Sequence, residues 1–197
     1  MIWRMTSFLK RADPANEIWI KADWCDLSLP ENYLDLVMGD MPWTVISIRE
    51  QEELRDKIAS ILKTDGLFIT RARLRNPARA RENGLEVIQR FLEKLDNHPE
   101  KYHLIGNEAV SYLHDITADA EGKRTNEAKT KALVLEATAL SRNPLHKKFL
   151  EGISRRSMGA NWTSQTHEEL LAILDKEFHI VAELNATDYD SEWYPVM

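Results

Sequence analysis

Three arginines alternate along one short stretch of the chain, at Arg71, Arg73 and Arg75. In an extended segment, residues two apart point to the same side, so these guanidinium groups can face one ligand. Guanidinium forks match the geometry of phosphate and carboxylate groups. We therefore predict that Arg71 and Arg73 bind an anionic group of a substrate. The alternative is a solvated rim in which the arginines pair with nearby acids.

Acidic residues close two segments that have the composition of buried strands. Asp23 ends the β-prone run 17–23 and is followed by Trp24, and Asp40 closes the run that begins at Leu34. Ligands of open α/β sheets lie over the carboxyl ends of the strands. We expect Asp23, Trp24 and Asp40 to lie at that edge. The alternative is that Asp23 caps a turn and Trp24 packs in the core.

The spacing of apolar residues predicts the elements that hold these side chains. Beyond Pro42 the pattern takes a helical period, with an apolar stripe at Leu54, Ile58, Ile61 and Leu62. We expect this helix to end at 64–66, with Gly66 in the left-handed conformation, and a strand to follow at 67–70. Strand, helix and strand with short turns make a βαβ unit, which builds a parallel sheet.

The middle of the chain differs in character from its two ends. No convincing strand interrupts residues 85–156, which are rich in Ala, Leu, Glu and Lys, so we predict a helical insertion or cap at 84–160. Thr166 and Glu169 have capping-box spacing and predict a helix start. Strands are expected at 178–184 and from 194 onward. The predicted fold class is therefore α/β, a Rossmann-like, mostly parallel sheet formed by residues 1–83 and 161–197.

The order of these elements is similar to that of class I S-adenosylmethionine-dependent methyltransferases. The match covers about residues 17–75 and, less specifically, 162–197. It consists of Ala22-Asp23-Trp24, then Leu29-Pro30, Tyr33-Leu34-Asp35-Leu36-Val37, Gly39-Asp40, a helix, and Lys63-Thr64-Asp65-Gly66 before a strand. The resemblance implies S-adenosylmethionine as the cofactor, with Asp23, Trp24 and Asp40 in contact with it. Asp23 would accept a hydrogen bond from the adenine amino group.

The segment Asp40-Met41-Pro42-Trp43 resembles the motif with which amino-group methyltransferases hold the target nitrogen. On that resemblance Asp40 and Trp43 are the catalytic candidates, and Arg71 and Arg73 lie on the substrate side. Met41 stands where the family has a first proline, which puts the rigid turn of that motif in question. The methyl acceptor is not identified by the sequence.

The family's first glycine-containing cofactor loop has no counterpart here. None of the seven glycines lies within three residues of another, and the 16 residues before Glu17 are too few for two strands and a helix. We therefore expect an N-terminally truncated methyltransferase fold, the later portion of such an enzyme. The alternative is a methyltransferase-like domain that binds a ligand or partner without chemistry. In either case a homo-oligomer could cover the sheet edge that the missing strands leave open.

Composition limits the remaining possibilities. The 26 basic and 32 acidic residues give a net charge of −6, so a chain-wide attraction to nucleic acid or anionic lipid is not expected. The single cysteine, Cys25, has no partner for an intramolecular disulfide, and no apolar stretch approaches the roughly 18 residues of a membrane span. We predict a cytoplasmic protein. Histidine spacing does not suggest a zinc site, so no metal is expected.

Overall fold

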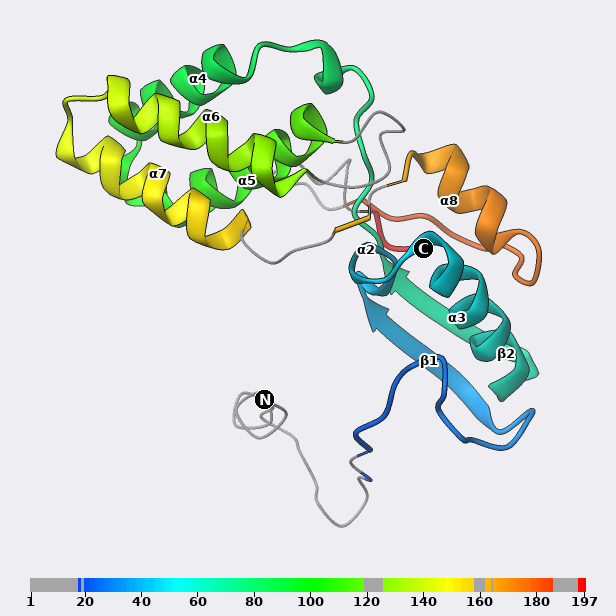
Figure 1. Cartoon of the computed structure of the whole chain (residues 1–197). Helices are drawn as coiled ribbons and strands as arrows, with labels where there is room; N and C mark the ends of the chain where they lie inside the picture. The colour runs from blue at the N-terminus through cyan, green and yellow to red at the C-terminus, as the bar shows by residue number, and fades with distance from the viewer. Residues whose placement is uncertain (1–17, 19, 119–125, 158–161, 164, 186–194) are drawn as a thin grey trace.

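A computed structural model describes residues 18, 20–118, 126–157, 162–163, 165–185 and 195–197. Its elements in chain order are β1 (Leu34–Asp40), α2 (Pro42–Val45), α3 (Ile48–Ile61), β2 (Leu62–Arg71), the 3-10 turn η1 (Arg79–Arg81), α4 (Gly84–Asn97), the 3-10 turn η2 (Pro99–Lys101), α5 (Tyr102–Thr117), α6 (Glu127–Leu140), α7 (Pro144–Ser157) and α8 (His167–Leu174). The fold is α/β, with a small two-stranded parallel sheet and several helices (Figure 1).

The predicted βαβ unit is confirmed. β1 and β2 run parallel, with Val37 opposite Phe68, and α3 connects them. Ser47 starts α3 with a capping box, because its side chain accepts from the N–H of Glu50 while the Glu50 carboxylate accepts from the N–H of Ser47. This exchange satisfies two backbone donors that a helix start leaves without partners.

The predicted end of α3 is wrong in both place and mechanism. The helix ends at Ile61, and Leu62 has an extended backbone (φ −74, ψ 143) that leads directly into β2. The N–H of Tyr33 donates to the carbonyl of Ile61 at 2.9 Å, so a neighbouring segment satisfies a carbonyl at the helix end. No left-handed glycine is needed, and Gly66 lies inside β2 without a positive φ.

The two further strands expected beside this unit do not form among the described residues. Residues 18 and 20–23 have no strand, and Ile18 is 88% exposed. In 178–184 the only pairing is a single antiparallel bridge between Leu184 and Val196. The physical reason is that a strand needs a neighbour along most of its length. No described segment pairs with the free edge of β1, and residues 178–183 form no backbone bridge with β2, although the Phe178 ring lies 5.5 Å from the Phe68 ring between centroids.

The C-terminal residues extend the sheet on the other edge. The N–H of Thr70 donates to the carbonyl of Met197 at 2.9 Å, and the N–H of Met197 donates back to Thr70 at 2.8 Å. Val196 exchanges the corresponding pair of bonds with Leu184 on its far side. The lateral order is therefore β1, β2, Val196, Leu184, and the last two pairings are antiparallel.

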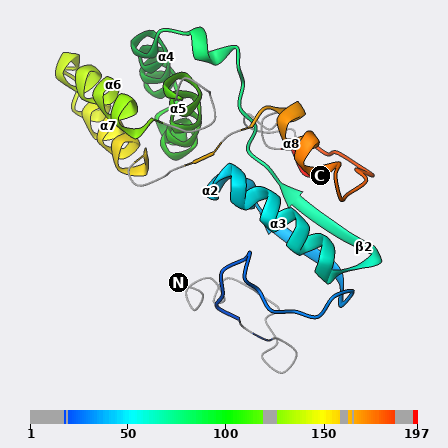
Figure 2. The ribbon, with the colours of Figure 1, turned by 45° about the vertical axis from the view of Figure 1, so that its right-hand side comes forward.

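Apolar side chains gather in two clusters. Helices α4, α5, α6 and α7 pack around one, whose largest fully buried members include Leu95, Leu113 and Phe149. The other lies between the sheet, α3 and α8 and includes Trp43, Leu74 and Leu170. Figures 1 and 2 show α4, α5, α6 and α7 on one side of the molecule and the sheet with α2, α3 and α8 on the other. Helices α4 to α7 confirm the predicted helical character in the described part of 84–160, while the domain boundaries stay a prediction.

Candidate functional site

Asp40 and Arg71 meet at the carboxyl ends of the two strands. The Asp40 carboxylate accepts from Arg71 Nε at 2.8 Å and from Nη2 at 3.1 Å, a bidentate pair whose side chains are 68% and 46% exposed respectively. Met41 follows with a positive φ of 54°, and its N–H donates to the carbonyl of Arg71 at 2.8 Å. The chain therefore turns sharply at Met41, the position where the family motif has proline.

Asp23 and Trp24 lie in a short turn near the same end of the sheet. Asp23 Oδ1 accepts from the N–H of Cys25 at 3.0 Å, and Cys25 Sγ lies 3.7 Å from the carbonyl of Glu50 in the first turn of α3. Because α3 starts just after β1 ends, this contact holds the turn toward the carboxyl edge. Asp23 thus caps a turn, as in the alternative interpretation, while Trp24 is 49% exposed and does not pack in the core.

Cys25 itself is not a candidate nucleophile. Burial, together with the negative charges of Asp23 and Glu53, raises the pKa of its thiol above the ordinary value. A raised pKa reduces the thiolate fraction at neutral pH, and the thiolate is the reactive form. This turn can therefore offer a carboxylate and an aromatic face to a ligand, but no activated sulfur.

Trp43 occupies the core and not the surface of a site. It is 1% exposed, and its ring meets that of Phe68 edge-on, with centroids 6.0 Å apart. Its backbone carbonyl accepts from Gln51 Nε2. Pro42 begins α2, where its fixed φ suits a helix start, and Trp43 follows it in the same short helix. The ring has no exposed face for a substrate, so the catalytic role predicted for Trp43 has no geometric support.

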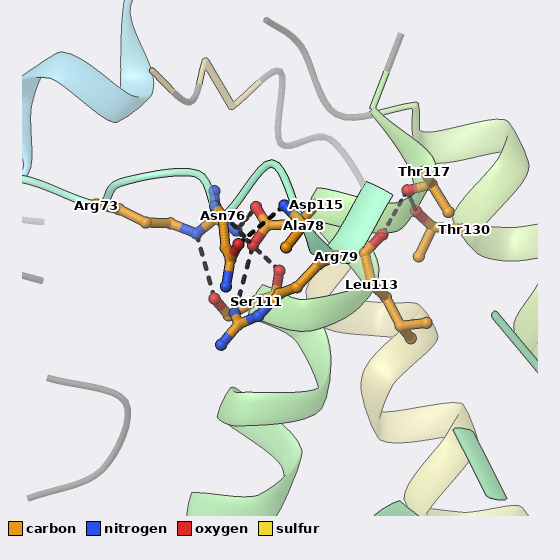
Figure 3. A network of polar contacts seen from close by, with 9 residues as sticks. All are labelled: Arg73, Asn76, Ala78, Arg79, Ser111, Leu113, Asp115, Thr117 and Thr130. Atoms are coloured by element: carbon orange, nitrogen blue, oxygen red, sulfur yellow. Dashed lines mark hydrogen bonds and ion pairs between the residues drawn. The ribbon is translucent and has the colours of Figure 1, made fainter. Parts of the chain in front are cut away.

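Arg73 turns away from the sheet edge and into the interior (Figure 3). Its Nη2 donates to Asp115 Oδ1 at 2.7 Å and to the carbonyl of Ser111 at 2.8 Å, both on α5. The second Asp115 oxygen accepts from Arg79 Nη1 at 3.3 Å and from the N–H of Asn76 at 3.4 Å. The side chains of Arg73 and Asp115 are each 1% exposed, so this is a buried ion pair that joins the segment after β2 to the helical cluster.

The alternating arginines therefore do not form one anion site. Arg71 pairs with Asp40 at the end of β1, Arg73 with Asp115 on α5, and Arg75 with Glu169 on α8 at 3.5 Å. Each positive charge contacts an acid, as in the alternative interpretation, although Arg73 is buried and not part of a solvated rim. Substrate binding by Arg71 stays a prediction.

The sequence did not predict that these residues form a buried network. Ser111 and Asp115 are four residues apart, so a helix presents them on one face, and this spacing was a usable signal. Their partners at 73 and 79 could not be inferred, because nothing local links α5 to the segment after β2. His114 is the other buried group here: burial, with the Arg73 charge as a second cause, lowers its pKa from the ordinary value to about 3.

Other site types find no support in the described part of the chain. No cluster of three or more His, Cys, Asp or Glu side chains has a metal-binding arrangement among the residues that the structure describes. None of the described helices combines the length and apolarity needed to cross a bilayer. A cavity of about 500 Å³ lies beside β2, and Asp23, Trp24 and Asp40 do not line it.

Comparison with known proteins gives a distant structural likeness. No protein-family model matches the chain, and no curated protein does. Among solved structures, the chain is similar to a crystal structure from Galdieria sulphuraria, provisionally named a sarcosine dimethylglycine methyltransferase. The identity is 12% and the TM-score is 0.32, with 82% of this chain and 60% of the other covered. The chain thus shares a distant structural resemblance with about three fifths of that methyltransferase, which assigns it neither an activity nor a binding site.

Proposed function

We propose that this chain is a methyltransferase-like α/β domain that binds the adenosine part of S-adenosylmethionine and belongs to the machinery of methyl transfer to an unidentified acceptor. The observation that carries the proposal is the position of two acids relative to the parallel βαβ unit. Asp40 ends β1, and the Asp23 turn is tied to the first turn of α3 at the same end of the sheet. This edge is where α/β sheets bind ligands.

The fit of the cofactor is partial. Exposed Asp23 and Trp24 can accept a hydrogen bond from the adenine amino group and stack on the base. Asp40 is held by Arg71, so a ligand group must compete with a bidentate ion pair for its carboxylate. No glycine-containing loop stands near these residues in the described part of the chain to hold the methionine end. The described residues therefore support adenosine recognition and give no chemical step.

Isothermal titration with S-adenosylhomocysteine tests this proposal directly. We expect micromolar binding by the full chain, weakened about tenfold or more by Asp23→Ala, since a hydrogen bond to a charged group contributes about 1.5–3 kcal/mol. Asp26→Ala is the control, because Asp26 is also an exposed acid of the same segment. Equal loss in both variants, or no binding by the folded wild-type chain, would refute adenosine recognition by Asp23.

A second pair of variants tests which end of β1 contributes to ligand binding. Asp35 and Asp40 are both exposed and both paired with a cation, Lys63 at 2.6 Å and Arg71 at 2.8 Å respectively, but they lie at opposite ends of the strand. We expect Asp40→Ala to change S-adenosylhomocysteine affinity and Asp35→Ala to leave it unchanged. The same result in both would show that the carboxyl edge has no special role.

The specific observation that favours a non-catalytic function is the state of the two catalytic candidates. Trp43 is buried in the core, and Asp40 is occupied by Arg71. A domain that binds a ligand or a protein partner needs neither group free. Binding of S-adenosylhomocysteine without methyl transfer to any acceptor class, measured with radiolabelled S-adenosylmethionine, is the result expected from this alternative.

A further inference from the structure

Helix α6 carries apolar side chains on its outer face as well as on its buried face. Its buried residues are Thr130, Val134 and Ala137, which face the other helices of the cluster. A helix at the surface normally directs polar residues to solvent, and one that is apolar all round is normally buried. On the side of α6 opposite its buried residues lies an exposed stripe, made of Ala128, Ala132, Leu135 and Ala139. This outer face therefore has the composition of a contact surface.

The exposed stripe runs along the axis of the helix. Its members are four, three and four residues apart, which is the spacing of apolar residues along the seam of two packed helices. Leu135 is the large side chain of the stripe and is 57% exposed. The other three members are alanines, which let a second backbone come close. The stripe thus offers a projecting leucine beside shallow positions, and a partner must supply the complementary shape.

Two opposite charges flank the stripe on the same side. Lys129 and Glu136 are seven residues apart, so they project from one flank of α6, two turns from each other. Both are exposed, and neither side chain forms an ion pair with another residue in the described part of the chain. About 10 Å of helix axis separates them, which is too far for them to pair with each other. Both charges are therefore available to groups on another molecule.

We propose that α6 of a second copy of this chain packs antiparallel on the exposed stripe, about a two-fold axis between positions 133 and 134. This register places Leu135 against the partner's Ala132, so the large side chain of each copy meets a small one. It also places Ala128 against the partner's Ala139. The contact is reciprocal, so it closes a dimer.

The flanking charges are complementary in this arrangement. An antiparallel two-fold pair brings each flank of a helix against the same flank of its partner. Lys129 then faces the partner's Glu136, and the symmetry repeats this pair at the other end of the contact. Charges beside a helix seam set partner choice and orientation. The dimer uses a surface away from the sheet, and it does not depend on cofactor binding.

The sizes of the side chains favour the antiparallel direction. A parallel pair in register brings the two copies of Leu135 together and the two copies of Ala132 together, which leaves voids beside the leucines, whereas protein contacts of this kind are closely packed. A parallel pair also brings Lys131, on the other flank, beside the partner's Glu136. The antiparallel pair places Lys131 near the partner's Thr138, which carries no charge. The lysines at 129 and 131 therefore distinguish the two directions.

Sedimentation equilibrium of the full chain tests the assembly. One pair of short helices makes a small interface, so we expect a weak dimer with a dissociation constant on the order of 100 μM. Leu135→Glu is expected to weaken it about tenfold or more, because it buries an unpaired charge in the seam. Leu104→Glu is the control, since Leu104 on α5 is similarly exposed, at 52%. A wild-type chain that stays monomeric up to roughly 1 mM, or equal effects of the two variants, would overturn the proposal.

Charge reversal in the same assay tests the direction. Lys129→Glu is expected to weaken the dimer about threefold or more, because like charges then face each other twice. The double variant Lys129→Glu with Glu136→Lys is expected to restore the wild-type affinity. Lys131→Glu is the matched control and is expected to have a smaller effect. No loss in Lys129→Glu, or a larger loss in Lys131→Glu, would contradict the antiparallel pairing.

Cross-linking identifies the surface that is used. Chains with Ala128→Cys mixed with chains carrying Ala139→Cys, both in a Cys25→Ser background, are expected to cross-link with a short bismaleimide. Ala128→Cys alone is expected to react far less, because antiparallel pairing separates the two copies of position 128 by about 16 Å along the axes. Efficient cross-linking of Ala128→Cys with itself would show a parallel pair, and absence of the mixed product would show that another surface joins the copies. Either result refutes the proposal.

Discussion

His114 lies in the last turn of α5 with its ring edge-on to Trp162, at 4.8 Å between centroids. It is 2% exposed, and its Nδ1 is buried without a hydrogen-bond partner among the described residues. Burial disfavours the charged imidazolium, and the nearby positive charge of Arg73 disfavours it further. Together they lower the pKa of His114 to about 3. His114 therefore stays neutral in the folded chain at pH values where an unfolded chain already binds a proton.

This difference predicts acid sensitivity. Because the unfolded pKa is the higher one, the unfolded state binds more protons between about pH 3 and 6.5, so the free energy of unfolding falls as pH falls through that window. Between pH 7 and 5 the loss from His114 is about 2 kcal/mol. Urea unfolding at both pH values is expected to show a smaller pH dependence for His114→Phe. His179→Phe, at an exposed position, is the control. An unchanged pH dependence in His114→Phe would contradict the assignment.

At the scale of elements, the capping box of α8 was predicted from the sequence and is confirmed. Thr166 Oγ1 accepts from the N–H of Glu169 at 3.3 Å, and the Glu169 carboxylate accepts from the N–H of Thr166 at 2.9 Å. Thr166→Ala is expected to lower the free energy of unfolding by about 1 kcal/mol, and Thr166→Ser by much less, since a hydroxyl remains. Equal losses in urea unfolding would mean that the hydroxyl does not cap the helix. The Ser47–Glu50 box of α3 has the same spacing in the sequence.

At the scale of the whole molecule, Asp115 connects the helical cluster to the segment that leaves the sheet. Its two oxygens accept from Arg73 and Arg79, in a site that excludes water. Asp115→Asn leaves two buried guanidinium groups without this carboxylate, and such a loss typically costs about 3–5 kcal/mol. Asp35→Asn breaks an exposed pair with Lys63 and is expected to cost less than about 1 kcal/mol. Similar losses in urea unfolding for both variants would show that burial does not strengthen the link.

The sequence by itself determined the parts of this protein that depend on neighbours along the chain. The stripe at Leu54, Ile58 and Ile61 predicted α3, the runs from Leu34 and Leu67 predicted the two parallel strands, and Thr166 predicted the start of α8. Helical hydrogen bonds close within four residues, and the parallel pair follows from a short strand–helix–strand succession, so local pattern is sufficient for both. Because the strand that begins at Leu34 was predicted, the position of Asp40 at its carboxyl end was predicted as well.

Only the tertiary structure decided what happens at the candidate site. Whether 17–23 or 178–184 become strands depends on a partner edge that the sequence does not name, and no strand forms at the described residues of either range. Side-chain ion pairs depend on distant residues in the same way. The Arg73 side chain points inward because it pairs with Asp115, which lies 42 residues away in the sequence. Strand pairing and buried ion pairs are contacts between distant segments, and their energies arise when packing brings those segments together and removes water.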